Sequence, residues 1–311
     1  MESIECQTYP NYEIVVADNA SSDTSIECIR ENFPRIRLIK NTSNLGFARA
    51  ANEVEKESRG EYLLFLNMDT WMEPDLIDLL ASKIRDNPRI AICGCTQLSY
   101  DSKTVLNSGS TTDFLGYPVA PESEKEILYA DGASLMIRRK VFEDLGGFDS
   151  RYFMYGEEVD LCWRALVAGH DVTVAANARI RHFSGGTVIQ RDQTYEVKRF
   201  RRYFFERNSL CSLLKNYSLG TLAWVLPSRV VVMSYEIGLL ILTGHGIFAI
   251  DIARAISWNL RYLRETLFLR GKTQRARRKS DAFVMRRMTK KLAIVIAFSS
   301  VSKKSSGLAW K

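Results

Sequence analysis

Cysteine and histidine are scarce in this chain. Its 311 residues contain six cysteines, none of them in a CxxC pair, and three histidines. At this chain length, such spacing argues against a disulfide scaffold and fits a reduced cytosolic protein, so we expect structural thiols. Residues 1–10 are polar and lack the apolar core of a signal peptide.

Low-complexity tracts, internal repeats and disorder signatures are also missing from the sequence, which is 46% hydrophobic and 25% charged. This composition suits one large domain with an appended segment. Residues 1–190 carry 19 Lys and Arg against 29 Asp and Glu, whereas residues 191–311 carry 24 against 7. We therefore expect two regions, 1–190 and 191–311, that face different partners.

The basic region lacks the usual signatures of nucleic-acid binding, and its charges flank apolar stretches. The expected partner is an anionic membrane surface and not nucleic acid. Residues 230–250 reach the length of a spanning helix but contain Glu236, and an acid inside a bilayer is costly. A span, an interfacial hairpin and a core helix stay open. We expect an apolar helix over 230–250, held on the membrane by basic residues of 270–279.

Short apolar runs alternate with helical patterns along the acidic region. Strands are expected at 12–17, 36–40, 62–66, 90–95, 133–137, 171–176 and 179–182, and helices at 23–32, 47–58, 75–85, around Val141 and at 157–168. This alternation is typical of an α/β fold with a parallel sheet. From residue 194 the pattern becomes helical.

Two acidic sites follow predicted strands, where open α/β sheets bind ligands. Asp18, Asn19 and Asp23 follow the first strand, and a carboxylate there can accept hydrogen bonds from a base or ribose. Turn chemistry and helix capping are the alternative for this group. Asn67 and Asp69 follow a fully apolar strand and offer the oxygen ligands that Mg²⁺ or Mn²⁺ prefers. An ordinary strand-to-turn transition is the alternative there.

A third acidic site opens the predicted helix at 157–168. Glu157, Glu158 and Asp160 must partly repel one another, although the helix N-terminus favours negative charge. Neighbouring aromatic residues and like charges raise a carboxyl pKa toward the range of a general base. A solvated helix start is the alternative.

His182 lies at a predicted strand end, directly before a glycine-containing turn. A lone histidine in such a place is usually structural. Gly185 and Gly186 would, however, allow the backbone to approach a ligand closely. Imidazole also suits a Mn²⁺-type site when carboxylates complete it.

Six segments of the acidic region form an ordered set. They read QTYPNYEIVVADNASSD (7–23), NTSNLGFARAANE (41–53), YLLFLNMDT (62–70), DGASLMIRRKVFEDLGGFD (131–149), YFMYGEEVDLCWRALVAGHDV (152–172) and RHFSGGT (181–187). Together they resemble family 2 glycosyltransferases, especially the bacterial rhamnosyltransferase-like branch. The resemblance implies the GT-A fold, a Rossmann-like α/β fold with a mostly parallel sheet. A helical, basic, membrane-associated segment would follow it.

The resemblance also implies roles on the donor side. Asp18, with Asn19 beside it, would contact the nucleotide base. Residues that would border the donor are Asn44, Gly46 and Asn52. Asp69 would bind a divalent metal, Mg²⁺ or Mn²⁺, with Asn67 in the first acidic slot of the motif, and His182 would be an auxiliary ligand of the metal or diphosphate.

On the acceptor side, Glu158 occupies the position of the family's catalytic base, flanked by Glu157 and Asp160. The family usually has Asp at that position, so the carboxylate of Glu158 stands one methylene further out. Gly132, Gly147 and Asp149 would shape the acceptor side.

The implied reaction is inverting transfer of a sugar from a nucleotide-diphosphate donor to a glycan or polyprenyl-linked acceptor, at the cytoplasmic face of the cell membrane. The favoured donor is dTDP-rhamnose, ahead of UDP-sugars. A non-catalytic nucleotide-sugar-binding or scaffold protein is the alternative.

That alternative arises because the family begins with a β-strand that precedes the segment QTYPNYEI, whereas this sequence opens at MESIECQTYP. In the family, the strand lies between those corresponding to 12–17 and 62–66. We therefore expect no backbone ladder between these two strands, and we expect the purified chain to aggregate.

Overall fold

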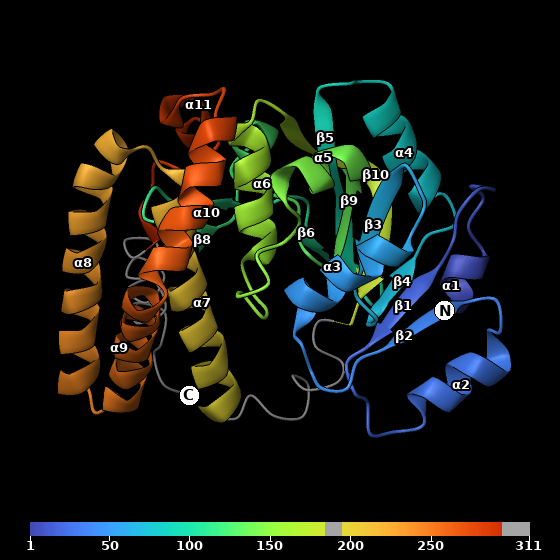
Figure 1. Cartoon of the computed structure of the whole chain (residues 1–311), viewed down its shortest axis with the longest axis horizontal. Helices are drawn as coiled ribbons and strands as arrows, with labels where there is room; N and C mark the ends of the chain where they lie inside the picture. Colours follow the sequence, from blue (N-terminus) through green and yellow to red (C-terminus); the bar gives the residue numbers. More distant parts are fainter. Residues whose placement is uncertain (184–194, 294–311) are drawn as a thin grey trace, which may run out of the picture.

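The computed structural model describes residues 1–183 and 195–293, which form a sheet flanked by helices and a group of long C-terminal helices (Figure 1). The main sheet has the strand order β3–β9–β5–β10–β4, with β6 also paired to β5. These strands are β3 (Tyr62–Leu66), β4 (Thr70–Met72), β5 (Ile90–Ser99), β6 (Val105–Asn107), β9 (Ser134–Arg138) and β10 (Asp171–His182).

The expected α/β fold of the GT-A type is confirmed, but this sheet is mixed rather than mostly parallel. Strand β9 lies antiparallel between β3 and β5, and β4 is antiparallel to β10, so β5–β10 is the parallel pairing along the main strand order. Residues 67–69 connect β3 to β4, and the chain reverses direction there. Parallel strands need a much longer crossover connection, so β4 cannot run parallel to β3. The short strand β4 was not predicted.

Strand β1 (Val15–Asp18) pairs in parallel with β2 (Arg37–Lys40) and forms a separate two-stranded sheet. Within residues 1–183, no ladder joins β1 to β3, as predicted, and β3 pairs with β9 alone. Strand β10 joins the two strands predicted at 171–176 and 179–182, with an irregularity between Ala175 and Arg179.

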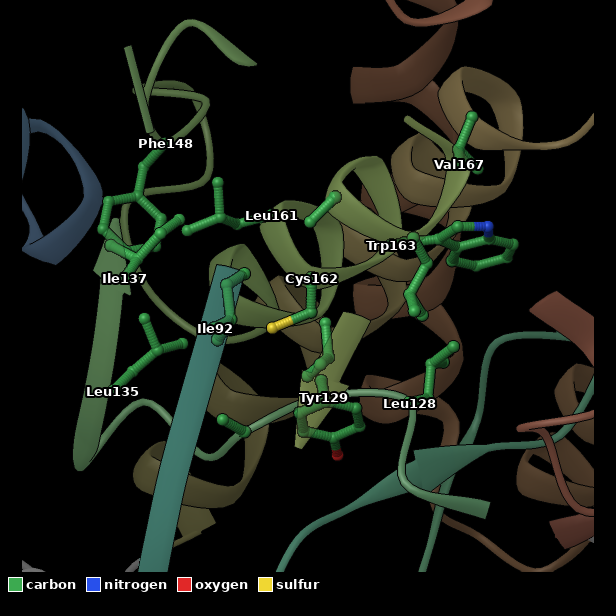
Figure 2. Close-up of a cluster of buried hydrophobic side chains, with 14 of the residues drawn as sticks. Ile92, Leu128, Tyr129, Leu135, Ile137, Phe148, Leu161, Cys162, Trp163 and Val167 are labelled. Carbon is green, nitrogen blue, oxygen red and sulfur yellow. The ribbon is translucent and has the colours of Figure 1, made fainter. Parts of the chain in front are cut away.

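Helices pack on both faces of the main sheet. Successive side chains of a strand point to opposite faces, and in the central strands the side chains on both faces are apolar. Helix α4 (Leu76–Arg85) packs over one face, which includes Cys93 and Met136. Helix α6 (Glu157–Val167) packs over the other face, where Leu161 and Cys162 lie near Ile92 (Figure 2). This core sets the position of the first turn of α6. The remaining helices of this part are α1 (Glu2–Glu5), α2 (Ser25–Asn32), α3 (Phe47–Glu57) and α5 (Arg139–Leu145).

Burial of the cysteines fits the expected structural thiols. Cys93, Cys95, Cys162 and Cys211 are buried, whereas Cys6 and Cys28 are exposed. Burial raises the pKa of Cys93 and of Cys95 to about 12, so neither thiol is ionised near neutral pH.

The C-terminal helices are α7 (Tyr195–Asn216), α8 (Leu219–Leu242), α9 (Gly246–Arg261), α10 (Leu263–Ala276) and α11 (Asp281–Met285). The prediction of one helix over 230–250 is wrong, because α8 ends at Leu242 and a turn with Gly244 at φ 76° leads into α9. In the described ranges, α8 is the one helix that is long and apolar enough to cross a membrane.

Two of the six basic residues in the expected lipid-binding cluster at 270–279 have another role. Arg270 and Arg277 donate hydrogen bonds to backbone carbonyls at the C-terminal end of α7, which a helix end leaves unpaired. Lys272 and Arg275 remain exposed.

Candidate active site

Asp69 and His182 lie together at the edge of the main sheet. Residue His182 ends β10 and is opposite Thr70 in the antiparallel pairing with β4, so Asp69 lies next to it. The backbone N–H of Phe183 donates to the Asp69 carbonyl, and His182 Nε2 is 3.2 Å from Asp69 Oδ1. This hydrogen bond raises the pKa of His182. Gly185 and Gly186 lie outside the described residues.

The Asp69 and His182 pair fits a divalent ion of the Mg²⁺ or Mn²⁺ class in its chemistry. One carboxylate oxygen and one imidazole nitrogen are suitable ligands. Across residues 1–183 and 195–293, no group of three His, Cys, Asp or Glu side chains could hold a metal. An ion here would therefore need further oxygen ligands from water or from a substrate diphosphate.

Glu157 and Glu158 begin α6 after Gly156. The backbone N–H of Gly156 donates to Glu158 Oε2 at 3.1 Å, and a Cβ atom on Gly132 would lie 3.8 Å from the Glu158 carboxyl carbon. Glu157 is 6% exposed, and its Oε2 is buried with no hydrogen-bond partner in the described structure. Glu158 is only partly buried.

The pKa values of both glutamates are raised. Burial raises the pKa of Glu157 to about 7. Burial and then the charges of Glu157 and Asp131 raise the pKa of Glu158 well above its usual value. A carboxyl group with a pKa of about 7, as in Glu157, can take up a proton near neutral pH.

Asp160 lies in a different environment from the two glutamates. It is fully buried and contacts Arg164 at 2.8 Å, Lys215 at 3.0 Å and the side-chain amide of Asn216 at 3.0 Å. Although burial alone would raise the pKa of Asp160, the charges of Arg164 and Lys215 hold it below its usual value. Asp149, expected on the acceptor side, is paired with Lys215 and Arg151.

The nucleotide-side candidates gather at the ends of β1 and β2. Asn19 donates to the Gly46 carbonyl and accepts a hydrogen bond from Asn41, while Asn44 accepts from the Gly46 N–H. Asp18 accepts a hydrogen bond from the Ser21 N–H in an Asx-type turn. Gly46 has φ 76°, and a Cβ there would lie 2.5 Å from the Phe153 ring.

Two other donor-side candidates make structural contacts. Asn52 exchanges hydrogen bonds with the backbone of Phe148 and contacts Ser150. The backbone N–H of Asn67 donates to the Ala133 carbonyl, which holds the turn after β3 against the start of β9.

Residues 1–146 match the profile of the family described as glycosyl transferase family 2. Over these residues the chain is similar to glycosyl transferase family 2. The O-antigen biosynthesis protein RfbC of Myxococcus xanthus is 32% identical in an alignment 202 residues long, which covers 58% of this chain and 16% of that protein. The N-acetylglucosaminyl-diphospho-decaprenol L-rhamnosyltransferase of Mycobacterium tuberculosis is 27% identical in an alignment 214 residues long, which covers 58% of this chain and 70% of the relative.

The solved structure of GalNAc-T7 has a similar fold. GalNAc-T7 with UDP, GalNAc and Mn²⁺ aligns with a TM-score of 0.56 at 15% identity, over 68% of this chain and 44% of the other. At that identity, the match bears on the fold alone.

One carboxylate close to the predicted site residues, Asp131, was not predicted from the sequence. The charge of Asp131 contributes to the raised pKa of Glu157, Glu158 and His182, so it lies among the groups that were predicted. The sequence prediction considered acidic residues that follow strands, whereas Asp131 comes before the first residue of β9. Since β9 is antiparallel to β3 and β5, its amino end lies at the same edge as their carboxyl ends.

A cavity of about 560 Å³ opens between β6 and the loops that follow β8. Strand β8 is Pro118–Val119 and pairs with β7, Thr111–Thr112. Tyr129 lies in the cavity wall, and its pKa is raised by burial and then by the charge of Glu158. Tyr129 therefore lines the cavity and also lies within reach of the charge of Glu158.

Proposed function

We propose that this chain is a glycosyltransferase that moves a sugar, with inversion, from a nucleotide-diphosphate donor to an acceptor hydroxyl. One observation carries the proposal. The pair Asp69 and His182 and the pair Glu157 and Glu158 gather around Asp131 at one edge of the sheet. The match of residues 1–146 to family 2 supports the same reaction class.

Glu158 is the proposed general base. The acceptor hydroxyl must lose its proton as its oxygen bonds to the anomeric carbon, while the bond to the diphosphate breaks and its electron pair stays with the leaving group. Glu158 is accessible and has a raised pKa, so its carboxylate can accept that proton. The more deeply buried Glu157 and Asp160 would support it. We propose that the acceptor binds on the side of the protein where the cavity lined by Tyr129 opens.

Asp69 and His182 would hold Mg²⁺ or Mn²⁺. When bound, such an ion stabilises the negative charge that develops on the diphosphate. Asp18, Asn19, Asn44 and Gly46 would form the nucleotide side, since they lie together beyond β1 and β2.

The proposed donor is dTDP-rhamnose, with UDP-sugars second, and the proposed acceptor is a glycan on a polyprenyl diphosphate. The sequence resemblance and the name of the mycobacterial relative support both choices. An acceptor of this kind resides in a membrane. We therefore place the protein peripherally at the cytoplasmic face, through the exposed apolar side of α8.

The test uses the purified chain with dTDP-rhamnose or UDP-sugars, an N-acetylglucosaminyl-diphospho-polyprenol acceptor and MnCl₂ or MgCl₂. We expect metal-dependent formation of a glycosylated lipid by the wild type and none by Asp69→Asn, which lacks one ligand charge. Donor binding without transfer from any of these donors would favour the non-catalytic alternative. Full activity of Asp69→Asn would contradict the metal assignment.

A further inference from the structure

The loop that leads into α6 has an unusual backbone. Phe153 has φ 65°, Tyr155 has φ 66°, and Gly156 has φ 84°. Residues with a Cβ atom rarely adopt positive φ, and each such residue costs roughly 1–3 kcal/mol unless its surroundings compensate. Contacts from outside the loop must therefore hold it in this conformation.

Helix α7 supplies those contacts. The side-chain amide of Asn208 donates to the carbonyl oxygens of Tyr152 at 3.1 Å, Met154 at 2.9 Å and Tyr155 at 2.6 Å. The neighbouring guanidinium of Arg207 donates to the carbonyl of Arg151 at 2.9 Å and to that of Tyr152. Asn208 and Arg207 are both buried.

Further along the same side of α7, polar side chains contact Tyr152 and α6. Ser212 shares a hydrogen bond of 2.8 Å with the Tyr152 hydroxyl, and Lys215 and Asn216 bind Asp160. These positions follow Asn208 at intervals of three or four residues along one side of the helix. Polar groups of α7 thus hold the chain on both sides of Glu157 and Glu158.

We propose that Asn208 is a positioning residue for the carboxylates of α6. Its amide holds the strained loop so that Gly156 can bind Glu158 and both glutamates face Asp131. This inference rests on the proposed function, because it assigns Asn208 a part in turnover. The basic C-terminal region then contributes to the reaction geometry as well as to membrane association.

Gln274 provides a matched control. Its side-chain amide also donates to three backbone carbonyls of neighbouring residues, those of Lys215, Asn216 and Tyr217, at 3.0–3.3 Å. These carbonyls lie at the C-terminal end of α7, about two helical turns beyond Asn208, and do not belong to the loop. Asn208→Ala and Gln274→Ala therefore remove equivalent hydrogen bonds at different places.

The experiment compares kcat, the donor KM, the Tm and amide hydrogen exchange over residues 151–158 in wild type and the two variants. We expect Asn208→Ala to lower kcat about 10²-fold, as for a misplaced catalytic group. Its donor KM should change less than about twofold, and exchange over 151–158 should accelerate. Gln274→Ala should lower the Tm similarly but leave kcat and loop exchange unchanged.

If Asn208→Ala does not fold, Asn208→Ser, which keeps one hydroxyl donor, should show an intermediate loss of kcat. Wild-type kcat in the Asn208 variant, equal kcat losses in both variants, or unaltered exchange over 151–158 would each overturn the inference. A wild type that transfers no sugar while the Asn208 variant accelerates loop exchange would instead refute the proposed function and leave the contact of α7 with the loop supported.

Discussion

Glu158 and Asp160 lie two residues apart but in different chemical surroundings. Glu158 is partly exposed, with a raised pKa, next to Gly132. We expect Glu158→Gln to lower kcat by about 10²–10⁴-fold, the usual range for loss of a general base, with donor affinity nearly unchanged. Steady-state kinetics with separate donor-binding measurements would check this.

Asp160→Asn is the complementary change. It leaves the buried charges of Lys215 and Arg164 without one partner, so we expect a loss of about 3–5 kcal/mol in the free energy of unfolding. Denaturant unfolding measures this loss. A larger fall in kcat for a folded Asp160→Asn than for Glu158→Gln would exchange the two roles.

The pH dependence of stability follows from Glu157. Its pKa is about 7 in the folded protein against a usual value of 4.5, so the folded state binds more protons between these values. Stability should then fall as pH rises through this window, by up to about 3 kcal/mol. Glu157→Gln should flatten the dependence of Tm on pH between about 4.5 and 7. An unchanged slope would contradict the raised pKa.

At the scale of elements, α8 has two different sides. On one side, Arg229 is fully buried and paired with Glu206, and Glu236 pairs with Arg202 of α7. On the other side, apolar residues are exposed, among them Val231 at 67% and Leu242 at 86%. Glu236, which made a spanning helix costly at the level of sequence, thus has an ion-pair partner within the protein.

The exposed side of α8 should bind lipid. We expect the double change Val231→Glu and Leu242→Glu to reduce co-sedimentation with phosphatidylglycerol vesicles at least about tenfold, because it adds two negative charges to an apolar contact. Val105→Glu, at an equally exposed apolar residue on β6, is the control and should bind normally. Equal binding by all three proteins would exclude α8 as the membrane contact.

At the scale of the whole molecule, α8 and α9 lie at one end, and α2 lies at the other end with β1 and β2 beside it (Figure 1). Net charge follows the same division along the chain, acidic before residue 190 and basic after it. One hydrophobic cluster nevertheless contains residues from both regions, such as Trp163 and Tyr217. The basic region is therefore packed onto the catalytic part.

Extraction of membranes with alkaline carbonate tests how the whole protein is held. A spanning α8 would have to leave its buried ion pairs with α7, which costs several kcal/mol. We therefore expect carbonate to release the protein, as for a peripheral protein. Resistance to carbonate would indicate a span, and complete recovery in the soluble fraction without carbonate would exclude membrane association.

Local sequence determined most helices and strands and the polar residues at their ends. Apolar periodicity predicted β3 at Tyr62–Leu66 and placed α3, α4 and α6 to within two residues, because these segments carry their own patterns of burial and turn residues. The same local order placed acidic residues after β1 and β3 and at the start of α6.

Only the tertiary structure decided which of these groups meet. His182 reaches Asp69 through the pairing of β10 with β4, and Asp131 joins them because β9 runs antiparallel. Arg207 and Asn208 are more than fifty residues from the loop they hold. Such contacts depend on strand order and helix packing, which are set by burial over the whole chain and leave no periodic signal in any one segment.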